Sequence, residues 1–185
     1  MLFGNKQQPL LGLDITTSSV KLIELSQSGK RYRVESYSAE PTPPSSVSEK
    51  AIVDAKAVGE AIRRAVKRAG AKATDVAVAI SGDAAITKVI QMAANLSERD
   101  LEGQVEIQAD QYMPFPMEEV SFDYEVIGPN DKDPELIDVL LGATRTENVE
   151  QRQAAVNAAG LSTHNVDVEA FALENACRLL SHQIP

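Results

Sequence analysis

Hydrophobic positions near the N-terminus follow the period of β-strands. A short apolar run over residues 10–13 indicates a buried strand, and near-alternation over residues 20–25 and 32–37 indicates two more. Small and polar residues at 26–29 separate the last two strands, as a turn does. The sequence therefore predicts a meander of three strands.

The period then changes to that of a helix. Prolines within residues 41–46 exclude regular structure there, so this segment is predicted to be a loop. One apolar face follows at helical spacing, and Gly70 is placed to end the helix. The face consists of Val58, Ile62, Ala65, Val66 and Ala69. The apolar run 76–80 predicts a buried strand that pairs in parallel with an earlier one.

A second set of elements begins after Gly82. Residues 85–92 are strand-like, and Ser97 is a predicted helix N-cap with Asp100 three residues later. Pro114 and Pro116 are expected to stop this helix. Its inward face is predicted to contain Leu101, Val105, Ala109 and Tyr112.

The last third of the chain continues with two strands and two helices. Residues 121–127 and 136–143 flank a turn-rich segment and predict an antiparallel hairpin, followed by a helix over 146–159. A short strand at 165–168 and a final helix at 169–180 complete the pattern. The inward residues of the final helix are predicted to be Phe171, Leu173, Ala176 and Leu180.

Charge divides the chain at nearly the same place. Residues 1–88 carry 13 Lys or Arg and 9 Asp or Glu, whereas residues 89–185 carry 5 and 18. Such a shift predicts two units with different surfaces. We expect one unit from residues 1–82 and 164–185, and an inserted α+β unit from residues 83–163. The acidic half would repel a phosphate backbone, which disfavours nucleic acid as a partner.

Composition narrows the class of protein. At 185 residues, with 43% hydrophobic and 24% charged residues, the chain is typical of a globular protein with a buried core. It contains a single cysteine, so no internal disulfide is possible. No apolar stretch approaches the length of a membrane span. We expect a cytoplasmic protein.

The segment GLDITTSSVKLIEL, residues 12–25, carries candidate chemistry. Asp14 ends a strand, the hydroxyl residues Thr16, Thr17, Ser18 and Ser19 form a turn, and Lys21 follows on the next strand. Backbone N–H groups of such a turn can bind an anion, and Lys21 could neutralise a phosphate. A Mg²⁺ ion would have to lie between Asp14 and that phosphate. The alternative is an ordinary solvated turn.

This motif resembles the first phosphate loop of the actin-like ATPase superfamily, although Thr16 stands where that family has glycine. Within the superfamily the chain resembles the PilM family of type IV pilus assembly proteins. The likeness rests on LLGLDITTSSVKLIELS, IQADQYMPFPMEEVSFDYEV and VDVEAFALENA, in that order. FtsA, a cell-division protein, shares the same plan.

The resemblance implies an α/β fold with a mixed sheet: an actin-like, RNase H-like first lobe with an inserted FtsA-type α+β subdomain and no second lobe. It implies ATP and Mg²⁺ as ligands of a full-length protein, with Asp14 near the metal and Glu169 near the nucleotide. Threonine at position 16 keeps a backbone farther from phosphate than glycine does. We therefore expect weak ATP binding by this chain. Any ATPase activity is expected to be weak and confined to the full-length protein.

The resemblance also implies a scaffold role. In the PilM family a groove between the two units receives the N-terminal cytoplasmic tail of PilN, a membrane protein, which would hold this chain at the inner membrane. Further pilus proteins and self-association are also expected. Candidate contacts are Gln108, Asp110, Tyr112, Pro114 and Phe115, although aromatic residues there could instead cover the inserted unit's core. The alternatives are an actin-like ATPase and an FtsA-like membrane adaptor.

Overall fold

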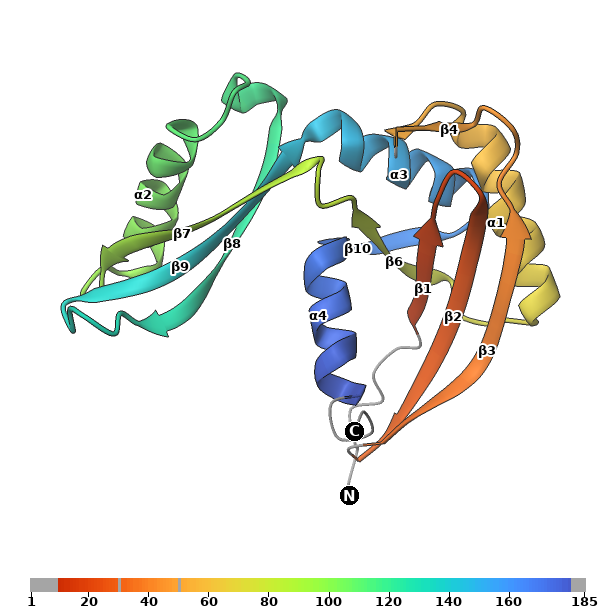
Figure 1. Cartoon of the computed structure of the whole chain (residues 1–185), viewed down its shortest axis with the longest axis horizontal. Coiled ribbons are helices and arrows are strands. Elements are labelled where there is room, and N and C mark those ends of the chain that lie inside the picture. Colours follow the sequence, from red (N-terminus) through yellow and green to blue (C-terminus); the bar gives the residue numbers. More distant parts are fainter. Residues whose placement is uncertain (1–9, 30, 50, 181–185) are drawn as a thin grey trace. The chain divides into compact units, whose positions relative to one another are not determined.

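The computed structural model describes residues 10–29, 31–49 and 51–180 (Figure 1). The chain forms two compact units. Unit 1 comprises Met1–Ala79 with Glu150–Pro185, and unit 2 comprises Ile80–Val149.

Unit 1 is built on a mixed sheet of five strands in the order β10-β6-β1-β2-β3. Strands β1 and β2 are antiparallel, β2 and β3 are antiparallel, and β1 pairs with β6 in parallel, as predicted. Their bounds are β1 Leu10–Ile15, β2 Ser19–Ser28, β3 Arg31–Pro41, β6 Asp75–Ile80 and β10 Ser162–Val168. The predicted loop after β3 leads into a small hairpin of β4, Val47–Ser48, and β5, Ala51–Ile52, which the sequence pattern did not indicate.

Helix α1, Ala55–Ala69, covers one face of this sheet. The carboxylate of Asp54 accepts the Ala57 N–H at its start, and Gly70 ends it at φ 65°, a conformation that glycine adopts readily. The fully buried Val58 and Ile62 of α1 lie in one cluster with alternate residues of β1, β2 and β6. Those alternate residues are Leu11, Leu13, Val20, Leu22, Val76 and Val78.

Helix α3, Thr146–Ala158, begins in unit 2 and ends in unit 1. Its buried residues Ala155 and Val156 belong to the hydrophobic cluster of unit 1. The boundary expected between residues 163 and 164 is therefore observed between residues 149 and 150, because most of this helix packs on unit 1. The other boundary falls at 79–80 instead of 82–83.

Unit 2 is a three-stranded antiparallel sheet in the order β7-β9-β8 with one helix on it. Its elements are β7 Ala85–Ala93, α2 Glu98–Asp110, the 3₁₀ turn η1 Met117–Glu119, β8 Val120–Pro129 and β9 Leu136–Arg145. Ser97 caps α2 through the Asp100 N–H, as predicted. Leu101, Val105 and Ala109 are buried against the sheet, but Tyr112 lies beyond the helix end and is 42% exposed.

The final helix, α4, spans Glu169–Leu180 as predicted, but the described residues of its expected inward face are not buried in a core. Phe171 is half-buried, Leu173 is 66% exposed and Ala176 is exposed. The side chain of Leu180 lies outside the described residues. The helix therefore leaves most of its apolar surface uncovered. Within the described ranges, no helix has the length and apolar character needed to cross a bilayer.

Candidate functional site

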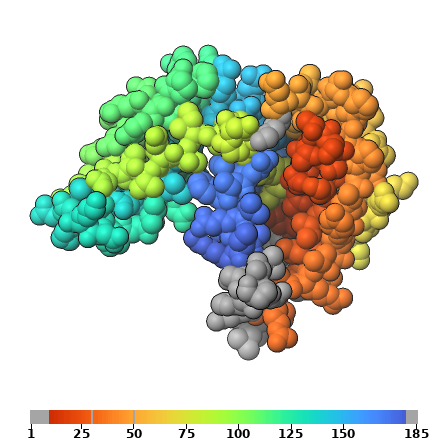
Figure 2. Space-filling model, in the orientation of Figure 1, coloured from red at the N-terminus to blue at the C-terminus, as the bar shows by residue number. Residues whose placement is uncertain are grey.

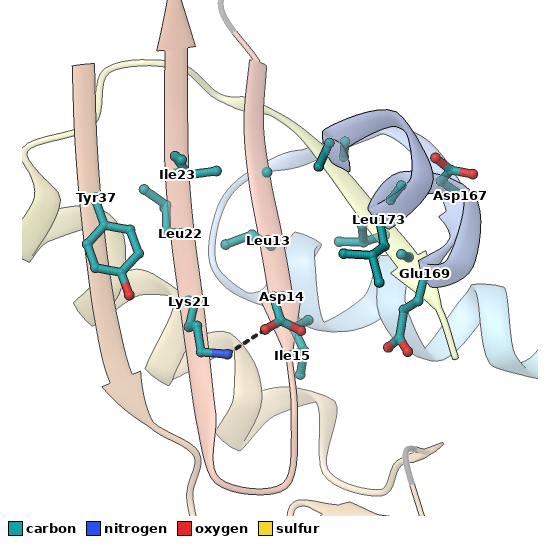
Figure 3. Close-up of a pocket in the computed structure, with 16 residues that line it drawn as sticks. Leu13, Asp14, Ile15, Lys21, Leu22, Ile23, Tyr37, Asp167, Glu169 and Leu173 are labelled. Carbon is teal, nitrogen blue, oxygen red and sulfur yellow. Dashed lines mark hydrogen bonds and ion pairs between the residues drawn. The ribbon is translucent and has the colours of Figure 1, made fainter. Parts of the chain in front are cut away.

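A pocket of about 620 Å³ lies in unit 1, on the face of the sheet that α1 does not cover. Because side chains alternate along a strand, Leu11 and Leu13 point toward α1 while Gly12 and Asp14 point into this pocket. Helix α4 closes its other side through Glu169, Ala172, Leu173 and Ala176. The pocket lies between α4 and the strands β1 and β2 in Figure 2, and Figure 3 shows its main side chains.

Asp14 and Lys21 form an ion pair in this pocket (Figure 3). They are directly opposite each other in the antiparallel register of β1 and β2, and Lys21 Nζ lies 2.8 Å from Asp14 Oδ2. The hydrogen bond and the negative charge of Asp14 raise the pKa of Lys21 above its ordinary value of 10.5. Both side chains are about half exposed, so the pair contributes little to stability. The positive charge of Lys21 is therefore already neutralised by Asp14, and the negative charge of Asp14 by Lys21.

The hydroxyl-rich turn between β1 and β2 is closed by Thr16. Its Oγ1 accepts the N–H of Ser18 at 3.4 Å and of Ser19 at 3.1 Å, and it donates to the Ser19 carbonyl at 3.0 Å. Thr42, just after β3, also bonds to this turn. Its hydroxyl donates to the Thr16 carbonyl, and its N–H donates to the Ser18 carbonyl. The N–H groups of Ser18 and Ser19 are thus bonded within the turn.

This arrangement does not fit a bound triphosphate. A phosphate-binding turn needs free N–H donors, and Thr16 already accepts those of Ser18 and Ser19. A Mg²⁺ ion at Asp14 would in addition have to compete with Lys21. In the described ranges, no group of three or more His, Cys, Asp or Glu could hold a metal ion.

Glu169 reaches the pocket from the first turn of α4, where a carboxylate also interacts favourably with the helix dipole. Behind it, Arg152 of α3 is 4% exposed and donates from Nε to the Ala79 carbonyl at 2.6 Å. Burial lowers the pKa of Arg152, and the negative charge of Glu169 opposes that shift. The negative charge of Glu169 therefore favours the charged form of the buried Arg152 guanidinium at the end of β6.

The structure brings only some of the predicted nucleotide residues together. Asp14, Lys21 and Glu169 line one pocket, whereas Thr16, Thr17, Ser18 and Ser19 do not. Sequence reasoning missed Asp167 and Tyr37 as pocket residues and Arg152 as a buried neighbour. Alternation along β3 could have placed Tyr37 on the same face as Lys21, but no pattern distinguishes Arg152 from a surface arginine.

The predicted partner-binding residues lie at and beyond the end of α2 in unit 2. Asp110, Tyr112 and Pro114 are exposed, and Gln108 is half-buried. Phe115 lies under the guanidinium of Arg145, 4.4 Å from ring centre to Cζ, while Lys88 lies 5.8 Å from the Tyr112 ring centre. Nearby, Met113 and Met117 pack on the core of unit 2. The segment therefore combines core residues with an exposed polar and aromatic surface.

Comparison with known proteins gives a family and a fold. A family model described as type IV pilus assembly protein PilM matches residues 12–185. A solved PilM-PilN type IV pilus biogenesis complex is similar over 94% of this chain, with 29% identity and a TM-score of 0.81. This chain spans 51% of that one.

A second similar structure is the cytoplasmic domain of EpsL, an inner membrane component of the type II secretion system of Vibrio cholerae. The match has a TM-score of 0.56 and 13% identity, and it covers 89% of this chain and 59% of that one. At this identity the likeness shows the fold alone. Together with the mixed sheet, these matches confirm the predicted fold class: an α/β, actin-like lobe with an inserted α+β unit.

Proposed function

Because the chain belongs to the family of the type IV pilus assembly protein PilM, we propose that it is an adaptor that docks the N-terminal cytoplasmic tail of a PilN-type membrane protein. The observation that carries this proposal is the similarity to a chain solved as part of a PilM-PilN complex, which extends over nearly all of the present chain. Docking of that tail would hold the protein at the inner membrane.

The charge of unit 2 supports a basic tail as the ligand. Residues 80–149 contain 15 Asp or Glu and 4 Lys or Arg, a net charge of −11, whereas the whole chain has −9. A surface of one sign steers an oppositely charged peptide and speeds its association. We place the contact on Asp110, Tyr112 and Pro114, which are exposed, with Gln108 and the Arg145-covered Phe115 beside them.

Calorimetric titration with a synthetic peptide of the PilN tail tests the proposal. Asp110→Lys and Tyr112→Ala should each weaken peptide binding about tenfold, the size expected of central contacts. Asp131→Lys is the matched control, because it reverses an exposed charge in the β8–β9 turn of the same unit and should bind like the unchanged protein. Binding should also weaken as salt is added. Equal affinity for all four proteins would contradict this placement, and no peptide response at all would contradict the function.

ATP is the second ligand of this proposal, as part of a longer protein. In this chain the N–H groups of Ser18 and Ser19 donate to Thr16 Oγ1, so we propose that ATP binds weakly and does not drive docking. Titrating ATP into the same sample separates the two functions. Tight ATP binding without a peptide response would favour an actin-like ATPase over an adaptor.

A further inference from the structure

The outer edge of strand β3 is open. In the described part of the chain, β3 is the last strand of the sheet in unit 1, and no strand pairs with its outer side (Figure 1). At 11 residues it is a long edge strand. An open edge presents a row of unpaired backbone N–H and C=O groups, which another strand can pair with.

The first half of β3 is accessible from the side. The second half is bonded to helix α1: Ser38 Oγ donates to the Ala65 carbonyl, and Glu40 pairs with Arg64 and Arg68. Residues 31–35, in contrast, are all exposed. Tyr32 is 47% exposed and Val34 is 55% exposed, values that are high for apolar residues in a strand.

The two faces of this segment differ in character. Val34 pairs with Leu25 of β2, and both are exposed apolar residues. On the other face Arg33 and Glu35 lie 3.7 Å apart, and Ser26 Oγ donates to Glu35 at 2.5 Å. Glu35 is the extra residue of a bulge, since the register skips it between Val34 and Ser36. The edge therefore presents a positive and a negative charge on either side of an apolar residue.

Self-pairing of this edge is restricted by geometry and charge. In an antiparallel pair of identical strands related by a two-fold axis, the axis must pass through a residue, because side chains alternate between faces. An axis through Tyr32 or Arg33 places two arginines opposite each other, and an axis through Glu35 places two glutamates opposite each other. Among axes through the exposed residues 31–35, only one through Val34 avoids like charges, because an axis through Arg31 also places two arginines opposite each other. It pairs Arg33 with Glu35 of the second copy, twice.

We propose that the β3 edge is a self-association surface that joins two copies of this chain through antiparallel pairing centred on Val34. The two five-stranded sheets then form one continuous sheet. Backbone hydrogen bonds and the contact between the two Val34 side chains stabilise it, and the charges select the register. Mixed charges on an edge strand also discourage pairing in other registers. This surface is independent of the tail-docking residues, which lie in unit 2.

Disulfide trapping tests the register directly. In a Cys177→Ser background, which removes the exposed native thiol, Val34→Cys should form a covalent dimer in mild oxidant, because the two Cβ atoms would face each other. Val53→Cys is the control and should stay monomeric, because Val53, in the segment between β5 and α1, is even more exposed at 66% but lies away from the β3 edge. Equal cross-linking of both variants would overturn the proposal.

Charge reversal tests the pairing without a new thiol. Arg33→Glu or Glu35→Arg alone places like charges opposite each other twice and should raise the dimer dissociation constant about tenfold in sedimentation equilibrium. The double exchange should restore it to within about twofold. Circular dichroism confirms that each variant is folded. A protein that stays monomeric at all concentrations, or a double exchange that stays as weak as either single variant, would overturn the proposal.

Discussion

Both units close a hairpin with a side-chain oxygen that accepts two N–H groups of the same turn. In unit 1, Thr16 Oγ1 accepts those of Ser18 and Ser19; in unit 2, Asn130 Oδ1 accepts those of Lys132 at 3.0 Å and Asp133 at 3.1 Å. The first turn matches a phosphate-loop motif and the second does not, yet the hydrogen-bond pattern of the two turns is the same. A side-chain oxygen in a turn can thus stabilise the turn itself, with no ligand involved.

The units differ in how their helices are supported. In unit 1, α1 is backed by α3, and Gly59 approaches Ala155 and Ala158 closely enough to leave no room for a side chain. In unit 2, α2 packs on its sheet alone, and Gly103 on that helix faces open space, with room for a methyl group. The same residue in the middle of a helix is therefore a packing requirement in one unit and a weakness in the other.

The largest effect is expected at these two glycines. A Cβ at position 59 would lie 2.6 Å from the Ala158 Cβ and 2.9 Å from the Ala155 carbonyl oxygen, so Gly59→Ala should lower the free energy of unfolding by about 2 to 3 kcal/mol. Gly103→Ala should raise it by about 0.5 to 1 kcal/mol, because alanine favours the helix. Urea denaturation followed by circular dichroism measures both. Changes of the same sign in the free energy of unfolding would contradict the difference in packing around the two glycines.

A smaller effect is expected on phosphate binding, and it should differ between the Thr16 turn and the Asn130 turn. Thr16→Gly frees the N–H groups of Ser18 and Ser19 and should strengthen pyrophosphate or ATP binding about tenfold, since two donors become available near Lys21. Asn130→Gly, the matched change in unit 2, should give no gain, because Asp131 and Asp133 flank that turn. Amide chemical shifts during a pyrophosphate titration report both. A Thr16→Gly protein that binds no more tightly would show that Thr16 does not close the site.

The smallest effect concerns the ion pair in the pocket of unit 1. Asp14 raises the pKa of Lys21, so the pair's contribution to stability is present below pH 10.5 and is lost as the pH rises through the folded-state pKa. Asp14→Asn should therefore lower the pKa of Lys21. A carbon-13 NMR titration of the lysine side chains between about pH 9 and 12 measures it. An unchanged Lys21 titration would show that the pair is not formed in solution.

Most of the element order could be predicted, because it depends on local patterns. The meander, the glycine end of α1 and the Ser97 cap of α2 each follow from neighbouring residues. The boundaries of the units could not, because α3 has the pattern of one helix, whereas its first turn belongs to unit 2 and its Ala155 and Val156 pack in the core of unit 1. The apolar residues of α4 likewise do not show which of them a neighbour covers.

The candidate site was predictable only in part. Asp14 and Lys21 are seven residues apart in sequence, and a hairpin of this length places them opposite each other, so their pairing follows from the register. Glu169 joins the same pocket from a distant part of the sequence, and its inclusion rested on resemblance. The hydroxyl-rich turn could be located from the sequence, but the hydrogen bonds of Ser18 and Ser19 to Thr16 are not visible in a sequence.

By itself, the sequence determined the order of the longer strands and helices, the acidic character of unit 2 and the Asp14–Lys21 spacing, because these depend on composition and on residues close together in the chain. Tertiary structure alone decided that Arg152 is buried beside the end of β6, that Gly59 lies against α3 and that the edge of β3 is open. Each of these depends on which distant segments come into contact. Packing between segments far apart in the chain leaves no local periodicity in the sequence.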